Sequence, residues 1–422
     1  MHNRFLAILF LALSAACQTL CHAENWPMWR GPRQDGTSRE TGLPVEWSAT
    51  ENIVWRLPLP GVAPSTPIVW DGKVFLTSTD RDGEDVLLLA IDATGKQLWQ
   101  QPIGHGESEQ MEKNNLAAAS PCTDGKYVWT LTGNGTVSCH DFAGNLRWQF
   151  QIEERYGSID MPWSIASSPV LDGQLLYLQL LHLNSSRVVA IDKASGSEVW
   201  NVERQTDATG KCMRSYATPI VYRDDEREYL LTQGQDYLVA HDLQDGSELW
   251  RCGDFHPRSG YDPMMHMSSS PVVGGGVILV PSGANGNFQA VRPHGKGEIT
   301  GDENYRLWNA YISPMRPSAL VVDSEAYVCM ESGVLHCLDL LTGELHYKRA
   351  VHRHTHHASP VSAEGRIYFT SRDGTVTVVR SGKEFEILAT NSLEESISAS
   401  PAISDGRIYL RTFDALYAIE KR

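Results

Sequence analysis

Two runs of metal-ligating residues occur far apart in this chain. One is His-Arg-His-Thr-His-His at 352–357, and the other is Met-Met-His-Met at 264–267. Neutral imidazoles ligate zinc and copper, and thioethers suit copper. Alternating histidines share one side of an extended segment. The pattern predicts a metal site formed by His266, His354, His356 and His357. No carboxylate or cysteine completes a familiar ligand spacing, however, and loop histidines are more often hydrogen-bonded or solvated.

A second group of residue types suits a small polar ligand. Arg214 and Arg316 can clamp a carboxylate, and Trp163 can stack on a flat ring. Glu394 and Glu395 can serve as a base or as calcium ligands. These arginines and glutamates can also have no role in ligand binding, because loop arginines often donate to backbone carbonyls and exposed glutamates are commonly solvated. The candidate ligand-binding residues are Asn115, Asp160, Trp163, Arg214, Tyr216, Arg316, Glu394 and Glu395.

A repeated hairpin pattern must position these side chains. Ala190–Trp200 reads A-I-D-K-A-S-G-S-E-V-W, and Ala240–Trp250 and Cys337–Tyr347 repeat it. Asp and Gly favour a tight turn, and the terminal aromatic has enough area to cover the next repeat. The aromatics predicted to dock one repeat on the next are Trp99, Trp148, Trp200, Trp250 and Tyr347.

A second marker, a small residue followed by proline, precedes a short apolar run in each repeat. The eight prolines are Pro67, Pro121, Pro169, Pro219, Pro271, Pro317, Pro360 and Pro401, of which Pro317 follows Arg316 and is a weaker copy of the marker. Four short strands fit each period, which is typical of a propeller blade. The sequence therefore predicts an all-β, eight-bladed β-propeller. The segments before the prolines would emerge on one face around the axis, and they carry the candidate ligand-binding residues.

The start of the chain is predicted to lie outside the fold. Residues 1–23 read as a signal peptide, with Arg4, an apolar run and Cys21-His22-Ala23 at the cleavage site. An alternative is lipidation at Cys17, because Ser14-Ala15-Ala16-Cys17 loosely resembles a lipobox. Residues 24–422 then form one domain, in which residues 24–64 supply a clasp over the ring and a strand that completes the last blade. Export to the periplasm or cell envelope follows.

The net charge excludes some classes of partner. The formal net charge of −15 argues against nucleic acid or anionic lipid as a partner. The six cysteines after residue 23 are Cys122, Cys139, Cys212, Cys252, Cys329 and Cys337. Cys139 and Cys337 occupy the small-residue position of the hairpin and are predicted to be buried. Cys212 and Cys252, in presumed loops, are the better candidates for a disulfide.

The hairpin pattern resembles the tryptophan-docking motif of pyrroloquinoline-quinone (PQQ) repeat propellers. This group includes the PQQ-dependent alcohol dehydrogenases and the propeller lipoprotein of the β-barrel assembly machinery. The opening Asn25-Trp-Pro-Met-Trp-Arg-Gly-Pro looks like secreted PQQ-like propellers. The resemblance implies that the docking aromatics are structural. It also implies that PQQ with calcium is the cofactor to consider, although no specific motif supports it.

The family's enzymes place adjacent, disulfide-bonded cysteines over PQQ, and they are longer than this chain, which has no adjacent cysteines. Three functions therefore stay open. The preferred one is a non-catalytic exported propeller that binds a ligand or protein through its axial face. The second is a PQQ- or metal-dependent oxidoreductase using Asn115, Trp163, Arg316 and Glu394. The third is an envelope-assembly scaffold that requires lipidated Cys17.

Overall fold

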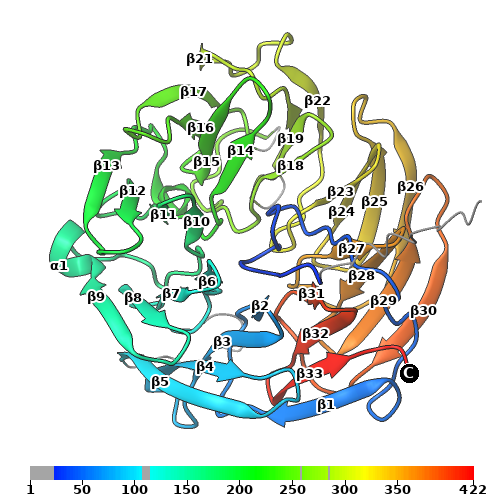
Figure 1. The fold of residues 1–422 in the computed structure, drawn as a ribbon. Helices are drawn as coiled ribbons and strands as arrows, with labels where there is room; N and C mark the ends of the chain where they lie inside the picture. The colour runs from blue at the N-terminus through cyan, green and yellow to red at the C-terminus, as the bar shows by residue number, and fades with distance from the viewer. Residues whose placement is uncertain (1–22, 107–114, 257–258, 284–285) are drawn as a thin grey trace, which may run out of the picture.

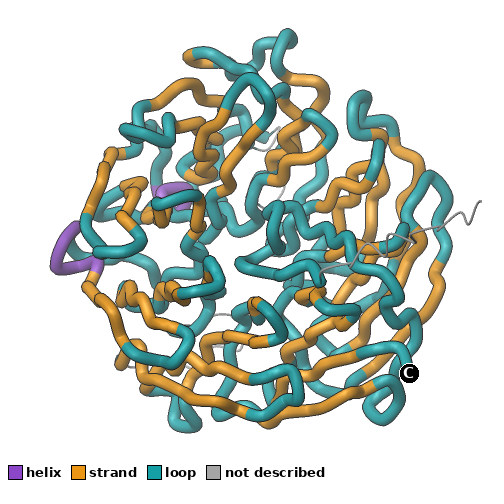
Figure 2. The backbone as a smooth tube through the Cα atoms, in the orientation of Figure 1, coloured by secondary structure: helices purple, strands orange, loops and turns teal. Residues whose placement is uncertain are grey.

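The predicted repeats form eight antiparallel sheets around a central axis (Figure 1). The computed structural model describes residues 23–106, 115–256, 259–283 and 286–422. Seven of the sheets have four strands, and the sheet of blade four has a fifth. Two short helical segments occur in the described residues, α1 (Ile152–Tyr156) and the 3₁₀ helix η1 (Gly210–Met213) (Figure 2). The all-β, eight-bladed propeller is confirmed.

The strands of blades one to four follow the order of the chain. They are β2 (Ile68–Trp70), β3 (Lys73–Thr79), β4 (Asp85–Ile91), β5 (Gln97–His105); β6 (Cys122–Thr123), β7 (Tyr127–Leu131), β8 (Thr136–Asp141), β9 (Leu146–Gln151); β10 (Val170–Asp172), β11 (Leu175–Leu180), β12 (Arg187–Asp192), β13 (Glu198–Glu203); β14 (Ile220–Arg223), β15 (Glu228–Gly234), β16 (Tyr237–His241), β17 (Glu248–Cys252).

Blades five to eight follow the same plan with two departures. Their strands are β18 (Val272–Gly274), β19 (Val277–Val280), β20 (Phe288–Val291), β22 (Arg306–Ala310); β23 (Leu320–Val322), β24 (Glu325–Cys329), β25 (Val334–Asp339), β26 (Leu345–Ala350); β27 (Val361–Ala363), β28 (Arg366–Thr370), β29 (Thr375–Arg380), β30 (Ile387–Ser392); β31 (Ala402–Ser404), β32 (Arg407–Arg411), β33 (Ala415–Ile419). An insertion in blade five supplies β21 (Gly297–Glu298), which pairs in parallel with β17. The other departure is the ring closure of blade eight.

The ring closes through the two ends of the described chain. The outermost strand of blade eight is β1 (Ile53–Pro58), which pairs antiparallel with β33. Its register joins Ile53 to Ile419 and Pro58 to Ala415. This pairing gives the last blade the same number of strands as the other regular blades. It also covers an edge that β33 would otherwise present to solvent.

Outer-strand tryptophans dock each blade on the next. The Trp200 ring packs on Gly246, and its Nε1 donates to Leu243 O over 3.0 Å. Trp99 and Trp148 make the same pair of contacts with the following blades. The predicted docker Trp250 likewise packs on Gly295 of the following blade, although its Nε1 has no described partner, and Tyr347 packs against Phe385. Two further tryptophans, Trp55 and Trp308, dock in the same way as Trp200, on Gly95 and Gly343.

Hydroxyl groups link the inner strands around the axis. The Ser120 backbone N–H donates to Ser168 Oγ over 3.0 Å, and Ser168 N–H donates to Thr218 Oγ1 over 3.0 Å. The same head-to-tail bond joins further consecutive blades, at 2.8 to 2.9 Å. The hydroxyls that accept these bonds belong to Ser120, Ser168, Thr218, Ser270, Ser318, Ser359 and Ser400. In blade six the hydroxyl marker is Ser318-Ala319, so the assignment of that marker to Arg316-Pro317 is wrong by two residues.

The N-terminal clasp, residues 24–47, lies over the centre of the ring (Figure 1). Trp26 pairs with Val69 of β2, and Thr37 pairs with Ser362 of β27. The buried Arg30 guanidinium donates to Ala319 O over 2.8 Å. The clasp also contacts the turns that follow the inner strands, since Glu40 accepts from the Gly406 N–H. It therefore closes the face opposite the segments that enter the inner strands.

Candidate functional site

An axial cavity of about 460 Å³ lies where the inner strands begin. Its wall contains six of the hydroxyl residues just described and Thr66, and Trp29 of the clasp also contacts it. The connecting segments between blades surround its mouth, because every outer strand leads back to the axis on this face. The lining side chains with aromatic or ionisable groups are Trp29, Trp163, Tyr216, His266, Arg316 and His357.

Three aromatic rings form one wall of the cavity. The Trp163 and His266 ring centroids are 5.3 Å apart, and Tyr216 lies 6.1 Å from Trp163. Tyr216 is 9% exposed, and its hydroxyl has no hydrogen-bond partner among the described residues. Burial raises the pKa of this phenol to about 12, so the group remains a neutral donor and acceptor. This wall can stack on a flat molecule and give it one hydrogen bond.

Cationic groups gather around the same wall. The Arg316 guanidinium lines the cavity and pairs with Glu331. Arg214 pairs with Asp160 at 2.9 Å, and the Lys211 ammonium lies 5.8 Å from the Trp163 ring centroid. Burial lowers the pKa of His266, and the charges of Arg316 and Lys211 lower it further. Two of these three cations, Arg316 and Arg214, are therefore paired with carboxylates at the cavity wall.

The predicted ligand-binding residues divide into two groups. Trp163, Tyr216 and Arg316 line the cavity, and Asp160 and Arg214 form an ion pair beside it. Asn115 is buried in a connector, where its amide bonds Val62 O and the Ala117 N–H. Glu394 is exposed and Glu395 pairs with Arg56, so neither lines the cavity. The proposed convergence of Glu394 with Arg316 and Trp163 is wrong.

The four histidines of the predicted metal site do not gather at one point. His266 and His357 line the cavity. His354 is exposed, whereas His356 is 1% exposed and its Nδ1 lies 2.9 Å from His354 O. The histidines do not share one side as predicted, because residues 352–357, in the connector between β26 and β27, are bent and not extended. The one described trio of ligand-type side chains with metal-site spacing is elsewhere, at Cys212, Asp236 and His256.

All six described cysteines are buried free thiols. The predicted disulfide between Cys212 and Cys252 is therefore wrong. The Cys212 thiol lies 3.1 Å from Asp262 O, while Cys252 lies 3.7 Å from the Gln289 amide oxygen. Cys139 and Cys337 are buried as predicted, each opposite the docking aromatic of its own blade, Trp148 and Tyr347.

Known proteins share this architecture. A family model described as outer membrane protein assembly factor BamB matches residues 84–346. No curated protein sequence matches the chain. In the described residues, no helix is long and apolar enough to cross a bilayer.

Solved structures resemble the propeller at low sequence identity. BamB from Moraxella catarrhalis is 15% identical, with a TM-score of 0.64 over 87% of this chain and 99% of that chain. Quinohemoprotein alcohol dehydrogenase from Comamonas testosteroni is 12% identical, with a TM-score of 0.67 over 94% of this chain and 81% of that chain. A europium-containing methanol dehydrogenase is 11% identical, with a TM-score of 0.66 over 93% of this chain and 90% of that chain. Identities this low show a shared fold. Because the family model spans more than half of the chain, the protein belongs to the BamB-like family of PQQ-repeat β-propellers.

Proposed function

We propose that this protein is a binding propeller whose axial cavity takes a small, flat carboxylate. The observation that carries the proposal is the buried, unpartnered hydroxyl of Tyr216, which lines the cavity beside Trp163. A buried polar group without a partner is uncommon in a protein interior, and a ligand is one way to satisfy it. The guanidinium of Arg316 lies on the same lining and, besides its pair with Glu331, has further N–H groups that can donate to a ligand carboxylate.

The groups that PQQ would need do not match the described lining. PQQ carries three carboxylates, and its calcium takes carboxylate and amide ligands. The described lining contains one guanidinium, and it contains no carboxylate, carboxamide or cysteine side chain. Asn115 and Glu394, which the oxidoreductase hypothesis requires, lie outside it. A role in binding without catalysis therefore fits these residues better than quinoprotein chemistry.

A binding experiment tests the carboxylate proposal. Benzoate and phthalate, with neutral benzamide for comparison, would be titrated into the purified chain while Trp fluorescence is followed. We expect the carboxylates to bind, and Arg316→Met and Tyr216→Phe each to weaken binding by about tenfold or more, which corresponds to about 1.4 kcal/mol. Arg223→Met is the matched control, because Arg223 pairs with Asp172 and Glu228 away from the cavity.

Either of two results would contradict the proposal. If benzamide bound as tightly as benzoate, recognition would not depend on the ligand's negative charge, and Arg316 would not have the proposed role. Carboxylate binding that survives both cavity substitutions would place the ligand elsewhere.

A protein partner at the cavity mouth is the second candidate. Tyr261, Met264 and Tyr311 lie in connectors on this face and are exposed by 48%, 58% and 42%. Exposed apolar and aromatic side chains near one another are typical of protein interfaces. A pull-down with Met264→Glu as the test variant separates this candidate from small-ligand binding, because Met264 does not line the cavity.

Export is part of the same proposal, and the clasp makes it testable. The backbone N–H of Glu24 donates to the Glu40 carboxylate, and the Glu24 carboxylate pairs with Arg33. Cleavage after Ala23 would convert that N–H into an ammonium beside Glu40. We expect N-terminal sequencing of the protein from its cell envelope to begin at Glu24. A lipid-modified Cys17 at the N-terminus would favour the scaffold hypothesis instead.

A further inference from the structure

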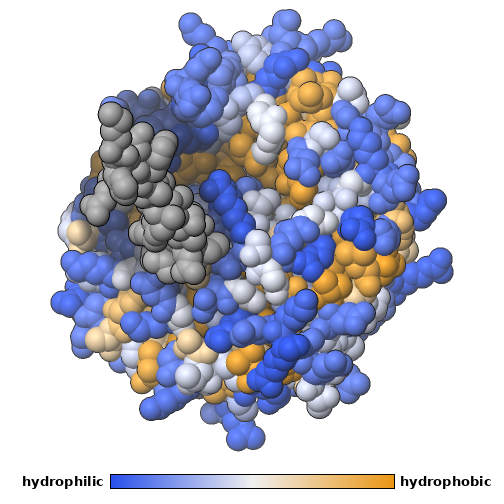
Figure 3. All heavy atoms as spheres, turned by 45° about the vertical axis from the view of Figure 1, so that its right-hand side comes forward, coloured by the Kyte–Doolittle hydropathy of each residue, from blue (hydrophilic) through white to orange (hydrophobic). Residues whose placement is uncertain are grey.

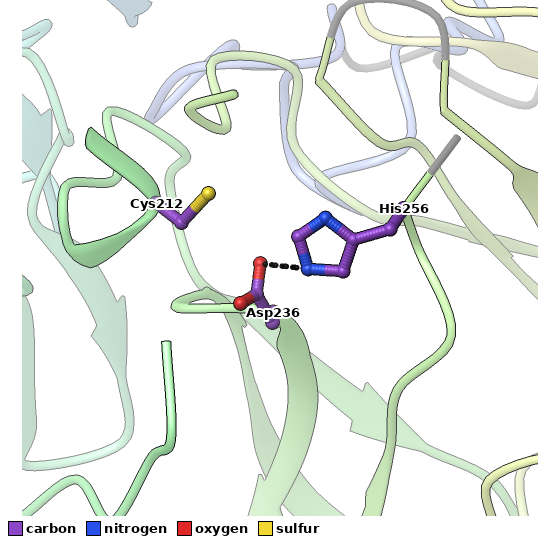
Figure 4. Close-up of side chains that lie close together, drawn as sticks. All are labelled: Cys212, Asp236 and His256. Carbon is purple, nitrogen blue, oxygen red and sulfur yellow. Dashed lines mark ion pairs between the residues drawn. The ribbon is translucent and has the colours of Figure 1, made fainter. Parts of the chain in front are cut away.

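Three ligand-type side chains meet on blade four, outside the axial cavity. They are Cys212 of η1, Asp236 in the turn between β15 and β16, and His256 in the segment after β17 (Figure 4). One donor atom from each lies within 4.8 Å of the other two. The three segments reach one place because the turn after the second strand and the connectors that enter and leave a blade share one face of a propeller.

The Asp236 carboxylate is buried, and its ion-pair partner is His256. The Asp236 side chain is 8% exposed, and neither oxygen accepts a hydrogen bond from a described residue. His256 Nε2 lies 2.9 Å from Oδ1, within ion-pair distance (Figure 4), although it does not meet hydrogen-bond geometry. A buried carboxylate without donors is strongly unfavourable in a protein interior. A cation at this point would remove that cost.

The geometry points to a zinc site formed by Cys212 Sγ, a carboxylate oxygen of Asp236 and His256 Nε2. Thiolate, imidazole and carboxylate are ligands that Zn²⁺ takes together, whereas calcium and magnesium prefer oxygen alone. Ligand atoms around tetrahedral zinc lie roughly 3.3 to 3.6 Å apart, from bonds of about 2.0 to 2.3 Å. The present spacing needs side-chain adjustment without a change of fold. Three protein ligands leave the fourth position to water.

Zinc binding displaces one proton from the Cys212 thiol to solvent and forms the Zn–S bond. The ion would add a link to three segments that hydrogen bonds already join. Lys211 N–H donates to Pro263 O at 2.7 Å, and Cys212 Sγ lies 3.1 Å from Asp262 O. Tyr261 packs on His256 with centroids 4.1 Å apart. The metal would therefore fix the loops of this face together.

The test uses the mature chain after dialysis against a chelator, with Co²⁺ as a coloured substitute for Zn²⁺. We expect one Co²⁺ per chain with a thiolate-to-metal charge-transfer band, and displacement of Co²⁺ by Zn²⁺. Cys212→Ala and Asp236→Asn should each weaken metal binding by about 100-fold or more. Cys252→Ala is the matched control, because Cys252 is also a buried free thiol and lies outside the trio.

Asp236→Asn also separates a metal ligand from a merely structural residue. Asp236 has a φ of 67°, which Asn adopts readily, so this variant should fold. Without metal, it should melt at a higher temperature than the wild type, because a buried charge is gone. With Zn²⁺ the order should reverse, since only the wild type gains stability from the ion.

Three results would overturn the site: no uptake of Co²⁺ by the wild type, bound Co²⁺ without the charge-transfer band, or metal binding by both variants that is as tight as that of the wild type. Equal destabilisation of Asp236→Asn with and without Zn²⁺ would show a structural carboxylate.

Discussion

Burial keeps several histidine side chains of this propeller neutral at acidic pH values at which an exposed imidazole would be protonated. His241 in β16 is 2% exposed, with Nδ1 2.9 Å from Gly246 O and Nε2 3.0 Å from Thr232 Oγ1. Burial lowers its pKa to about 4, and burial likewise lowers the pKa of His140 and His356 to about 4. These imidazoles are neutral in the folded state at pH 7.

The lowered pKa of His241 predicts acid destabilisation. Below pH 6.5 the unfolded chain binds protons that the folded chain resists, so the free energy of unfolding falls as the pH falls towards 4. We expect a loss of about 2 kcal/mol from this histidine between pH 7 and pH 5. Urea unfolding at the two pH values would show that His241→Gln reduces the difference by about this amount.

The control is His105→Gln, because Asp85 raises the pKa of this exposed histidine. His105→Gln should therefore leave the decrease in the free energy of unfolding between pH 7 and pH 5 in place. An unchanged pH dependence in His241→Gln would show that other groups cause the fall.

At the scale of the element, one tryptophan and one glycine join each pair of docked blades. Gly246 has a φ of 74°, and a Cβ there would lie 2.6 Å from the Trp200 ring. Gly276, in the turn between β18 and β19, has the same φ of 74° but no atom within 4 Å of a Cβ. The two glycines therefore share a φ value, but only Gly246 has a tryptophan ring packed on it.

This pair predicts two different losses of stability. Gly276→Ala should cost about 1 kcal/mol, the cost of a side chain in the left-handed region. Gly246→Ala should cost about 1 to 3 kcal/mol more, because the methyl group pushes the docked indole away. Equal losses in urea unfolding would show that the stacking on Gly246 contributes no specific stability.

The elements also show what the sequence could and could not reveal. The hairpin aromatics and hydroxyl-proline steps predicted the fold, because each recurs at a fixed place in most of the blades. Blade six was misread by two residues, since Ala319 replaces proline after Ser318 and Arg316-Pro317 lies just before. Trp308 was missed as a docking residue because the insertion carrying β21 hides the repeat.

The candidate sites were harder to predict than the blades. Arg316, Trp163, Tyr216 and His266 were found because connectors converge on the axis. Which connector side chains turn inward depends on the local backbone conformation. Glu394 is an example, because its backbone has a φ of 58° and its side chain is exposed. Cys212, Asp236 and His256 come from three separate segments, so no spacing in the sequence connects them.

At the scale of the whole molecule, buried arginines connect neighbouring blades. Arg411 of blade eight is fully buried and donates to Ser65 Oγ at 2.7 Å, Ser78 Oγ at 3.1 Å and Thr77 O, all before or within blade one. Arg204 at the end of blade three reaches Gly234 O and Tyr237 O of blade four. Burial lowers the pKa of each guanidinium to about 9. In an oblique view, turned by 45° from that of Figure 1, hydrophilic residues cover much of the visible surface (Figure 3).

Arg411 is expected to stabilise the closed ring. Arg411→Ala removes the guanidinium donor to two hydroxyls, leaves Thr77 O with only the Ser65 hydroxyl as its side-chain donor, and opens a cavity, so it should lower the free energy of unfolding by about 3 kcal/mol. The exposed Arg380→Ala should change it by less than about 1 kcal/mol. Urea unfolding compares the two variants, and similar values would show that Arg411 does not help to close the ring.

The pairing of β1 with β33 also sets an order in time. A chain that emerges from its N-terminus makes β1 and the clasp first, yet Ile53 pairs with Ile419 almost at the other end. Seven blades can form from segments that are neighbours in the sequence, whereas the eighth requires both β1 and β33. Until β33 has been made, β1 has an open edge that invites pairing with other chains. The arrival of β33, more than the formation of any other blade, is therefore the step that removes this open edge.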